Sequence, residues 1–216
     1  MGKCVKRIQL IGNPAIQTGM DKRSSFVPFF LALCPVLILM YMVMRFPLEA
    51  PFRDSWSLVP FLEKMYQGTL DPTDLLAQHA EHRPFFPRVI LLSLARLTHW
   101  DLFYEAALNF VLAIGIFLNF LFLFRRSLQE IGRVRLPLWF IPVISAFLFS
   151  LVQYENFWVG WQLVLMLNIY AVTWGTIFLC TGKISWLRIG AAAVCGIVAT
   201  FSHAIGLFFW LVGAGV

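Results

Sequence analysis

PFRDSWSLVPFLEKMYQGTLDPTDLLAQHAEHRPFFPR, residues 51–88, is the long polar segment that separates the apolar runs of this chain. In the chain as a whole, 60% of the residues are hydrophobic and 13% are charged. A soluble domain carries about twice that charged fraction. The sequence therefore predicts membrane helices that are interrupted by one long polar loop, and most of any chemistry is expected in that loop.

The apolar runs on both sides of this loop are long enough to cross a membrane. A run of roughly 18 or more apolar residues spans the hydrocarbon core as a helix, so we predict an all-α, polytopic membrane protein with about five spans. The expected spans are Phe26–Phe46, Leu102–Phe124, Leu136–Val152, Leu163–Cys180 and Ile189–Val216, the last interrupted at Ser202 and His203.

The distribution of basic residues predicts the orientation of these spans. Cytoplasmic loops carry an excess of Lys and Arg. Residues 1–25 are basic, and the loop 125–135 holds four arginines against Glu130, so we expect both on the cytoplasmic side. Residues 47–101 and 153–162 then form outer loops, and Val89–Trp100 is too short to cross. The net charge of +6 is explained by this anchoring rather than by nucleic-acid binding.

The chain is expected to have two parts. Residues 1–25 form a cytoplasmic basic N-terminus, and residues 26–216 form the transmembrane domain. Because the sequence ends inside an apolar run, we expect this domain to continue beyond Val216. The four cysteines show neither CxxC spacing nor pairing within a polar loop, so the sequence indicates neither disulfides nor a zinc site.

The first outer loop contains two predicted juxtamembrane helices. Residues 57–67 place Leu58, Phe61, Leu62 and Met65 on one face, with Glu63 and Lys64 opposite. Such an amphipathic helix is suited to lie on the bilayer surface, and Gly68 ends it. Asp71 is predicted to cap a second helix that begins at Pro72.

Two carboxylates are the candidate catalytic groups. Asp54 precedes the first juxtamembrane helix, where it could activate an acceptor hydroxyl, hold a metal, or simply cap the helix. Glu155 is the acidic residue of the second outer loop, and an acid so near the hydrocarbon is costly without a partner. In the predicted topology both lie on the same side of the membrane and could converge on one pocket.

Cations in front of the short apolar segment are candidates for binding phosphate. Arg83 and Arg88 can bind a phosphate in bidentate fashion, although interfacial snorkelling of such arginines is an equal alternative. His79 and His82 have the spacing of two metal ligands on a helix, but no third ligand follows at a suitable spacing. His203 lies inside a predicted span, as a functional group or as a neutral, hydrogen-bonded side chain.

The order of these features resembles the GT-C superfamily of membrane glycosyltransferases, especially its protein O-mannosyltransferase and aminoarabinose-transferase branch. In that family an acidic residue follows the first span. It is followed in order by juxtamembrane helices, a His/Lys-Pro-Pro-type motif, a short apolar helix, a span and a basic turn. A second acidic residue comes after this turn. The corresponding features here are Asp54, residues 82–88, residues 89–100, Arg125 with Arg126, and Glu155. The likeness runs from about Phe26 to Trp161; the second acid after Asp54 and the adjacent Pro-Pro pair are missing.

The resemblance implies an enzyme that moves a sugar from a polyprenyl-phosphate donor to an acceptor on the outer face of the membrane. Asp54 and Glu155 would be catalytic, His82, Arg83 and Arg88 would neutralise the lipid phosphate, and Asn156 would contact substrate. No cofactor is required by this resemblance, and a divalent metal is the candidate. The expected partners are the lipid-linked donor and membrane lipid.

We therefore expect an integral, multi-pass protein of a bacterial inner membrane with a cytoplasmic N-terminus. The alternative is a non-enzymatic polytopic protein, either a transporter subunit or a scaffold. A transporter should show paired broken helices near the middle of the membrane, whereas the sequence contains one candidate interruption, at Ser202 and His203.

Overall fold

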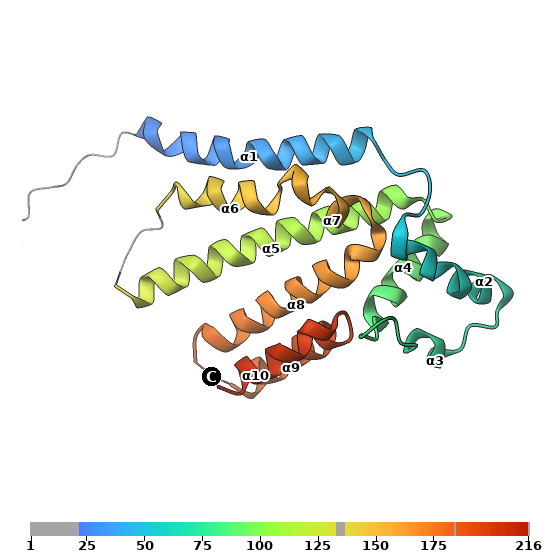
Figure 1. The fold of residues 1–216 in the computed structure, drawn as a ribbon. Helices are drawn as coiled ribbons and strands as arrows, with labels where there is room; N and C mark the ends of the chain where they lie inside the picture. The colour runs from blue at the N-terminus through green and yellow to red at the C-terminus, as the bar shows by residue number, and fades with distance from the viewer. Residues whose placement is uncertain (1–21, 133–136, 184, 216) are drawn as a thin grey trace, which may run out of the picture.

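A computed structural model describes residues 22–132, 137–183 and 185–215 and shows helices throughout this part of the chain, without strands (Figure 1). The predicted all-α polytopic fold is confirmed. The elements in chain order are α1 (Lys22–Arg45), η1 (Arg53–Leu58), α2 (Val59–Gln67), α3 (Pro72–Leu75), α4 (Phe85–Thr98), α5 (Leu102–Glu130), α6 (Phe140–Leu148), η2 (Leu151–Gln153), α7 (Tyr154–Trp158), η3 (Gly160–Gln162), α8 (Leu163–Cys180), α9 (Trp186–Thr200), η4 (Ala204–Leu207) and α10 (Phe208–Gly213).

Four helical segments of the described chain are long and apolar enough to cross a membrane. They are Phe26–Arg45, Leu102–Glu130, Phe140–Trp158 and Gly160–Cys180. In Figure 1 they form one bundle, with α2, α3 and α4 gathered at one end and the α8–α9 turn at the other. The loops 47–101 and 153–162 therefore share one end of the bundle, as the sequence-based topology requires. The basic segment 1–21 lies outside the described residues.

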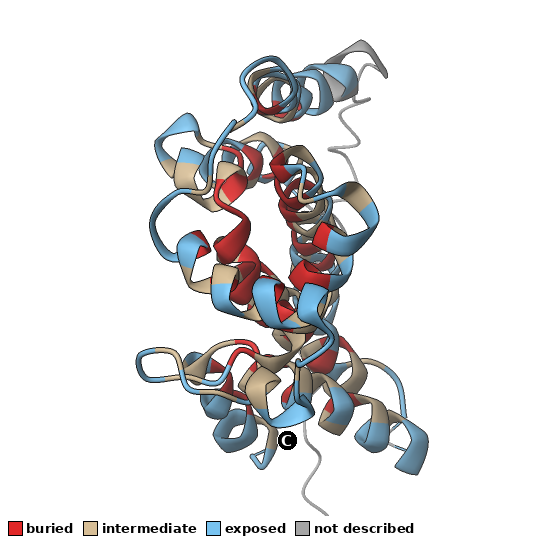
Figure 2. Cartoon of the chain, turned by 90° about the vertical axis from the view of Figure 1, so that its right-hand side faces the viewer, coloured by how far each residue is buried: buried red, intermediate tan, exposed pale blue. Residues whose placement is uncertain are grey.

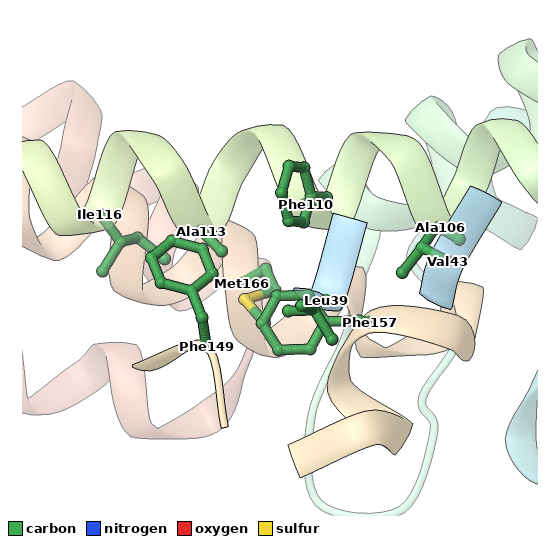
Figure 3. Packing of buried hydrophobic residues seen from close by; sticks show 9 residues of the cluster. All are labelled: Leu39, Val43, Ala106, Phe110, Ala113, Ile116, Phe149, Phe157 and Met166. Atoms are coloured by element: carbon green, nitrogen blue, oxygen red, sulfur yellow. The ribbon is translucent and has the colours of Figure 1, made fainter. Parts of the chain in front are cut away.

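The bundle is held together by a core between α1, α5, α7 and α8. Figure 3 shows Phe110, Phe149 and Phe157 of this core, which pack with their ring centroids 6.0–6.4 Å apart. Aromatic rings at such distances attract one another beyond the effect of their burial. The buried members of the cluster are Leu39, Val43, Ala106, Phe110, Ala113, Ile116, Phe149, Phe157 and Met166.

The outer faces of the same helices carry large apolar side chains. Phe26 and Phe30 of α1 are 73% and 68% exposed, and Val111 of α5 is 61% exposed. Figure 2 shows the buried positions on the sides of helices that face one another, with exposed positions outside. Exposed apolar surface along helices of spanning length is what lipid covers, so the burial pattern agrees with a membrane protein.

The first juxtamembrane helix forms as predicted, and its apolar side packs on the protein. Gly68 terminates α2 with a φ of +71°, a left-handed conformation that glycine adopts without strain. The predicted apolar face packs against α4, with Leu58 and Leu62 buried and Phe61 and Met65 partly buried. Leu58 and Leu62 are buried against Leu91 and Leu92 of α4. These apolar side chains are therefore removed from water by contacts within the protein.

The second juxtamembrane helix is a single turn. Asp71 caps α3, with its side chain accepting a hydrogen bond from the Thr73 N–H at 2.7 Å, and Asp74 completes a capping box. The cap was predicted correctly. The helix that follows the cap has four residues, because the chain leaves α3 after Leu75 and enters a turn.

The short apolar segment after this loop does not have the length of a span. Helix α4 has 14 residues, which corresponds to about 21 Å of rise and is less than the hydrocarbon core of about 30 Å. Its buried face, which includes Leu91 and Ala95, is part of the cluster beneath the outer loop. This agrees with the prediction that Val89–Trp100 does not cross.

The fifth predicted span is a helical hairpin. Helix α9 ends at Thr200, the chain turns at Phe201–His203, and η4 and α10 return beside α9. A methyl group on Gly213 of α10 would lie 3.4 Å from Leu179, near the far end of α8, so the end of α10 comes back to the end where α9 began. The expectation that Ile189–Val216 forms one crossing is therefore corrected. Gly206 permits the turn, because a Cβ there would lie 2.3 Å from the Ala199 carbonyl carbon.

Candidate functional site

The two candidate carboxylates lie on loops that meet. Arg53, the residue before Asp54, donates a hydrogen bond to Oε2 of Glu155 at 2.6 Å across a sequence separation of 102 residues. The Tyr154 hydroxyl donates to the other oxygen, Oε1, at 3.1 Å. An exposed ion pair of this kind contributes about 0–1 kcal/mol to stability. Its consequence is positional, because it holds the second outer loop beside the start of η1.

Asp54 is exposed at the first turn of η1. Its side chain makes no helix-capping hydrogen bond, so the plain capping role considered for Asp54 is not observed. Arg53 has a φ of +51°, a left-handed conformation that is uncommon for a non-glycine residue. Backbone conformations of this type cluster at functional sites, where the surrounding structure maintains them.

A cavity of about 380 Å³ is lined in part by Tyr154, whose hydroxyl donates to Glu155. Its volume is within the range of small-molecule sites. Its wall combines rings from the segment after α1 with rings from α7, and Trp158 also donates a hydrogen bond to the Phe46 carbonyl at 2.6 Å. The lining residues are Phe46, Leu48, Phe52, Tyr154, Trp158 and Val159.

The remaining residue predicted in this loop, Asn156, is half-buried. Its amide donates to Oε1 of Gln153 at 3.2 Å, one turn earlier. Asn156 does not line the aromatic cavity.

The two arginines expected to bind phosphate have different environments. Arg83 is exposed. Arg88 is 2% exposed and donates to the carbonyl oxygens of Leu75 and Ala77, while its guanidinium lies 4.6 Å from the centre of the Phe61 ring. Arg88 therefore ties α4 to the loop after α3, and its donors are directed to backbone carbonyls of the protein.

His82 is part of a histidine cluster that the sequence did not predict. Its ring stacks on His203 with centroids 4.7 Å apart. The His79 ring lies 5.8 Å from the His82 ring and 4.7 Å from the Trp161 ring. Both ring nitrogens of His82 are buried without a hydrogen-bond partner among the described residues. Burial, followed by the charges of His203 and His79, lowers the pKa of His82 below its ordinary value.

The cluster joins the outer loop to the turn of the α9–α10 hairpin. The Phe86 N–H donates to the Phe201 carbonyl at 3.3 Å, beside the stacked rings. Asn168 of α8 donates to the Ala199 carbonyl at 2.9 Å from the interior. The interruption at Ser202 and His203, which was noted in the sequence as a break in a span, is thus a docking point for the first outer loop.

The metal-ligand hypothesis for His79 and His82 assumed a helix. The two residues instead form an antiparallel bridge, with N–H to carbonyl distances of 2.8 and 3.1 Å. In the part of the chain that the structure describes, no group of three or more His, Cys, Asp or Glu side chains is arranged to hold a metal ion.

Glu105 is a buried acid that sequence reasoning missed. It lies in the first turn of α5 with 3% exposure, accepts a hydrogen bond from the Trp100 indole at 3.1 Å, and packs directly on Gly160 of the second outer loop. A carboxylate one turn inside an apolar run was the available signal, because such a group needs a protein partner.

The geometry thus gives two groups of side chains on one end of the bundle. Asp54, Arg53 and Glu155 are chain neighbours of Phe52 and Tyr154, which line the aromatic cavity. His79, His82 and His203 lie at the hairpin turn, and the second outer loop contacts both groups. Compared with known protein families, with curated proteins and with solved structures, the chain gives no match.

Proposed function

We propose that this chain is a membrane glycosyltransferase, or part of one, that moves a sugar from a polyprenyl-phosphate donor to an acceptor at the outer face of the membrane. The observation that carries the proposal is the Arg53–Glu155 ion pair at 2.6 Å. It joins two loops from distant parts of the sequence and leaves Asp54 exposed next to them.

The chemistry of such a transfer matches the groups at this end of the bundle. An acceptor hydroxyl needs a carboxylate that can orient it or take its proton, and Asp54 is the exposed carboxylate at this point. Glu155, oriented by Arg53 and Tyr154, would position the acceptor beside it. The aromatic wall formed by Phe52 and Trp158 offers an apolar and flat surface for a sugar face or the first isoprene units.

The leaving group of the reaction is a lipid phosphate, which needs cationic stabilisation more than a strong acid. Arg83 is the arginine exposed for this role. We assign Arg88 a positioning role rather than a phosphate-binding role, because the N–H donors of Arg88 are directed to backbone carbonyls. His82 supports the same loop through its contact with His203.

The test is transfer by the purified full-length protein in proteoliposomes, with a panel of radiolabelled polyprenyl-phosphate sugars and release of the lipid phosphate as the readout. Asp54→Asn should lower turnover about 100-fold or more, the range expected for loss of a general base. Glu63→Gln is the matched control, since Glu63 is an exposed carboxylate of the same loop on α2, and it should retain turnover.

Two outcomes would contradict the proposal. Full activity of Asp54→Asn would remove Asp54 from the chemistry. No turnover of any donor by protein that is folded and correctly inserted would favour the non-enzymatic alternative, a transporter subunit or scaffold.

A further inference from the structure

The end of the bundle opposite the outer loops contains a second, basic pocket. It has a volume of about 440 Å³ and lies between the C-terminal part of α5 and the turn that joins α8 to α9. Figure 1 shows these two segments at this end of the bundle. Its lining residues include Arg125, Arg126 and Gln129 of α5, Thr181 and Gly182 of the turn, and Arg188 of α9. None of its described lining residues is acidic.

Arg188 is held in place at this pocket. Its Nε donates to the Phe178 carbonyl at 3.0 Å and its Nη2 to the Ile177 carbonyl at 3.3 Å, and Nη2 also contacts the Thr181 hydroxyl. These bonds satisfy the last carbonyls of α8, which a helix end leaves without partners. They leave Nη1 as a donor, and it lies only 2.7 Å from where a Cβ of Gly182 would stand. The glycine therefore makes room for the guanidinium along the pocket wall.

Of the other two arginines, one has no acidic partner within the described residues and one has a partner outside the pocket lining. Arg125 is exposed and makes no hydrogen bond or ion pair within the described residues. Arg126 approaches Glu130 at 3.5 Å, a pair whose carboxylate is 61% exposed to solvent. Three guanidinium groups around one cavity repel one another, and an anion bound between them would offset that repulsion.

The surroundings of the pocket place it at the membrane surface. Trp186 and Leu187, immediately before Arg188, are 88% and 84% exposed, and Phe122 in the pocket wall is 48% exposed. Exposed Trp beside Arg at the end of spanning helices is typical of headgroup depth. Basic pockets between spanning helices at this depth bind the phosphates of anionic lipids.

We propose that this pocket binds the headgroup phosphate of an anionic phospholipid in the leaflet at the basic end of the bundle. Arg125, Arg126 and Nη1 of Arg188 donate to the phosphate oxygens, with Phe122 against the start of the lipid chains. The proposal is independent of the transferase proposal, because the pocket lies at the opposite end of the molecule. General attraction between basic loops and lipid is a different effect, since it needs no fixed arrangement of donors.

The experiment is native mass spectrometry of the full-length protein in detergent with phosphatidylglycerol, with phosphatidylcholine and with inorganic phosphate. Wild-type protein should retain one phosphatidylglycerol in preference to phosphatidylcholine. Arg125→Gln should lower the apparent affinity about tenfold, the effect of losing one charge-assisted hydrogen bond. Arg188→Gln should lower the affinity by a similar factor. Because Arg188 also caps the end of α8, this variant can fail to fold, and Arg125→Gln then still tests the proposal.

Arg96→Gln is the matched control, because Arg96 is an exposed arginine of α4 at the other end of the bundle. It should leave phosphatidylglycerol retention unchanged. Equal losses in Arg96→Gln and Arg125→Gln would show non-specific attraction and overturn the proposal. Displacement of the lipid by millimolar phosphate would also overturn the proposal, because the ligand of the pocket would then be free phosphate. Equal retention of phosphatidylcholine and phosphatidylglycerol would overturn it as well.

Discussion

At the scale of single residues, the contact between Gly160 and Glu105 controls how the second outer loop meets α5. A Cβ at Gly160 would lie 1.6 Å from Oε2 and 2.6 Å from Cδ of the buried Glu105. Gly160→Ala must therefore displace either the carboxylate or the loop, and overpacking of this kind costs about 1–3 kcal/mol. We expect a lower thermal unfolding midpoint in detergent.

The control for this prediction is Gly213→Ala, whose Cβ would meet only a flexible leucine side chain at 3.4 Å. It should unfold close to the wild-type temperature. An unchanged midpoint for Gly160→Ala would mean that Glu105 does not occupy the space against the loop.

His82 gives a prediction about pH. Burial, His203, His79 and Arg88 lower its pKa below the ordinary value of 6.5, while Glu81 acts in the opposite direction. The folded protein then binds a proton at His82 more weakly than the unfolded chain does. Its contribution to stability is present above about pH 6.5 and is lost as the pH falls through the folded-state pKa.

We therefore expect the unfolding midpoint of the wild type to fall between pH 7.5 and pH 5, and His82→Gln to lose part of that pH dependence. His99→Asn is the control, since His99 is exposed at the C-cap of α4 with a φ of +55°, which Asn tolerates. The prediction fails if His82→Gln and wild type show the same pH profile.

At the scale of elements, the α9–α10 hairpin is the feature that differs most from the sequence-based expectation. Helix α9 has 15 residues, a rise of about 22 Å, which is short of the hydrocarbon thickness of about 30 Å. The chain turns back because the break at Ser202 and His203 is stabilised by contacts to α4 and α8. Those contacts, from Phe86 and Asn168, come from other elements and leave no signal in the local sequence.

The hairpin is testable by crosslinking. Cysteines placed at Leu179 and Gly213 in a background without native cysteines should crosslink with a short bifunctional reagent, because the two positions are in contact. In one continuous crossing they would stand at opposite membrane faces and would not react together.

Gly206→Ala should reduce this crosslinking, since its Cβ would lie 2.3 Å from a backbone carbon of Ala199, an atom that cannot rotate away. Gly190→Ala is the control in α9, where a Cβ meets nothing within 4 Å. Efficient crosslinking in Gly206→Ala would show that the turn does not depend on this close approach.

At the scale of the whole molecule, the two ends of the bundle differ in chemistry. One end carries Asp54, Glu155 and the histidine cluster, and the other carries the arginine pocket. By the excess of basic residues, the arginine end is predicted to be cytoplasmic.

Labelling with a membrane-impermeant thiol reagent tests this orientation. In a cysteine-free background, a cysteine at the exposed Gln67 on α2 should react in intact cells, and one at the exposed Gln129 on α5 should react only after permeabilisation. Labelling of Gln129 from outside would reverse the orientation and place the carboxylates in the cytoplasm.

The sequence by itself determined the helical membrane class, the long apolar helices, the α2 stop at Gly68 and the cap at Asp71. These features depend on local hydropathy and on backbone preferences within a few residues. The tertiary structure alone decided that Arg88 is buried, that the apolar face of α2 packs on α4, and that α9 is followed by a returning segment. Partners such as Arg53 and Glu155 are 102 residues apart, and their contact follows from the packing of the helices between them. No local pattern encodes that packing, because each apolar helix can bury its hydrophobic surface either against lipid or against other parts of the protein.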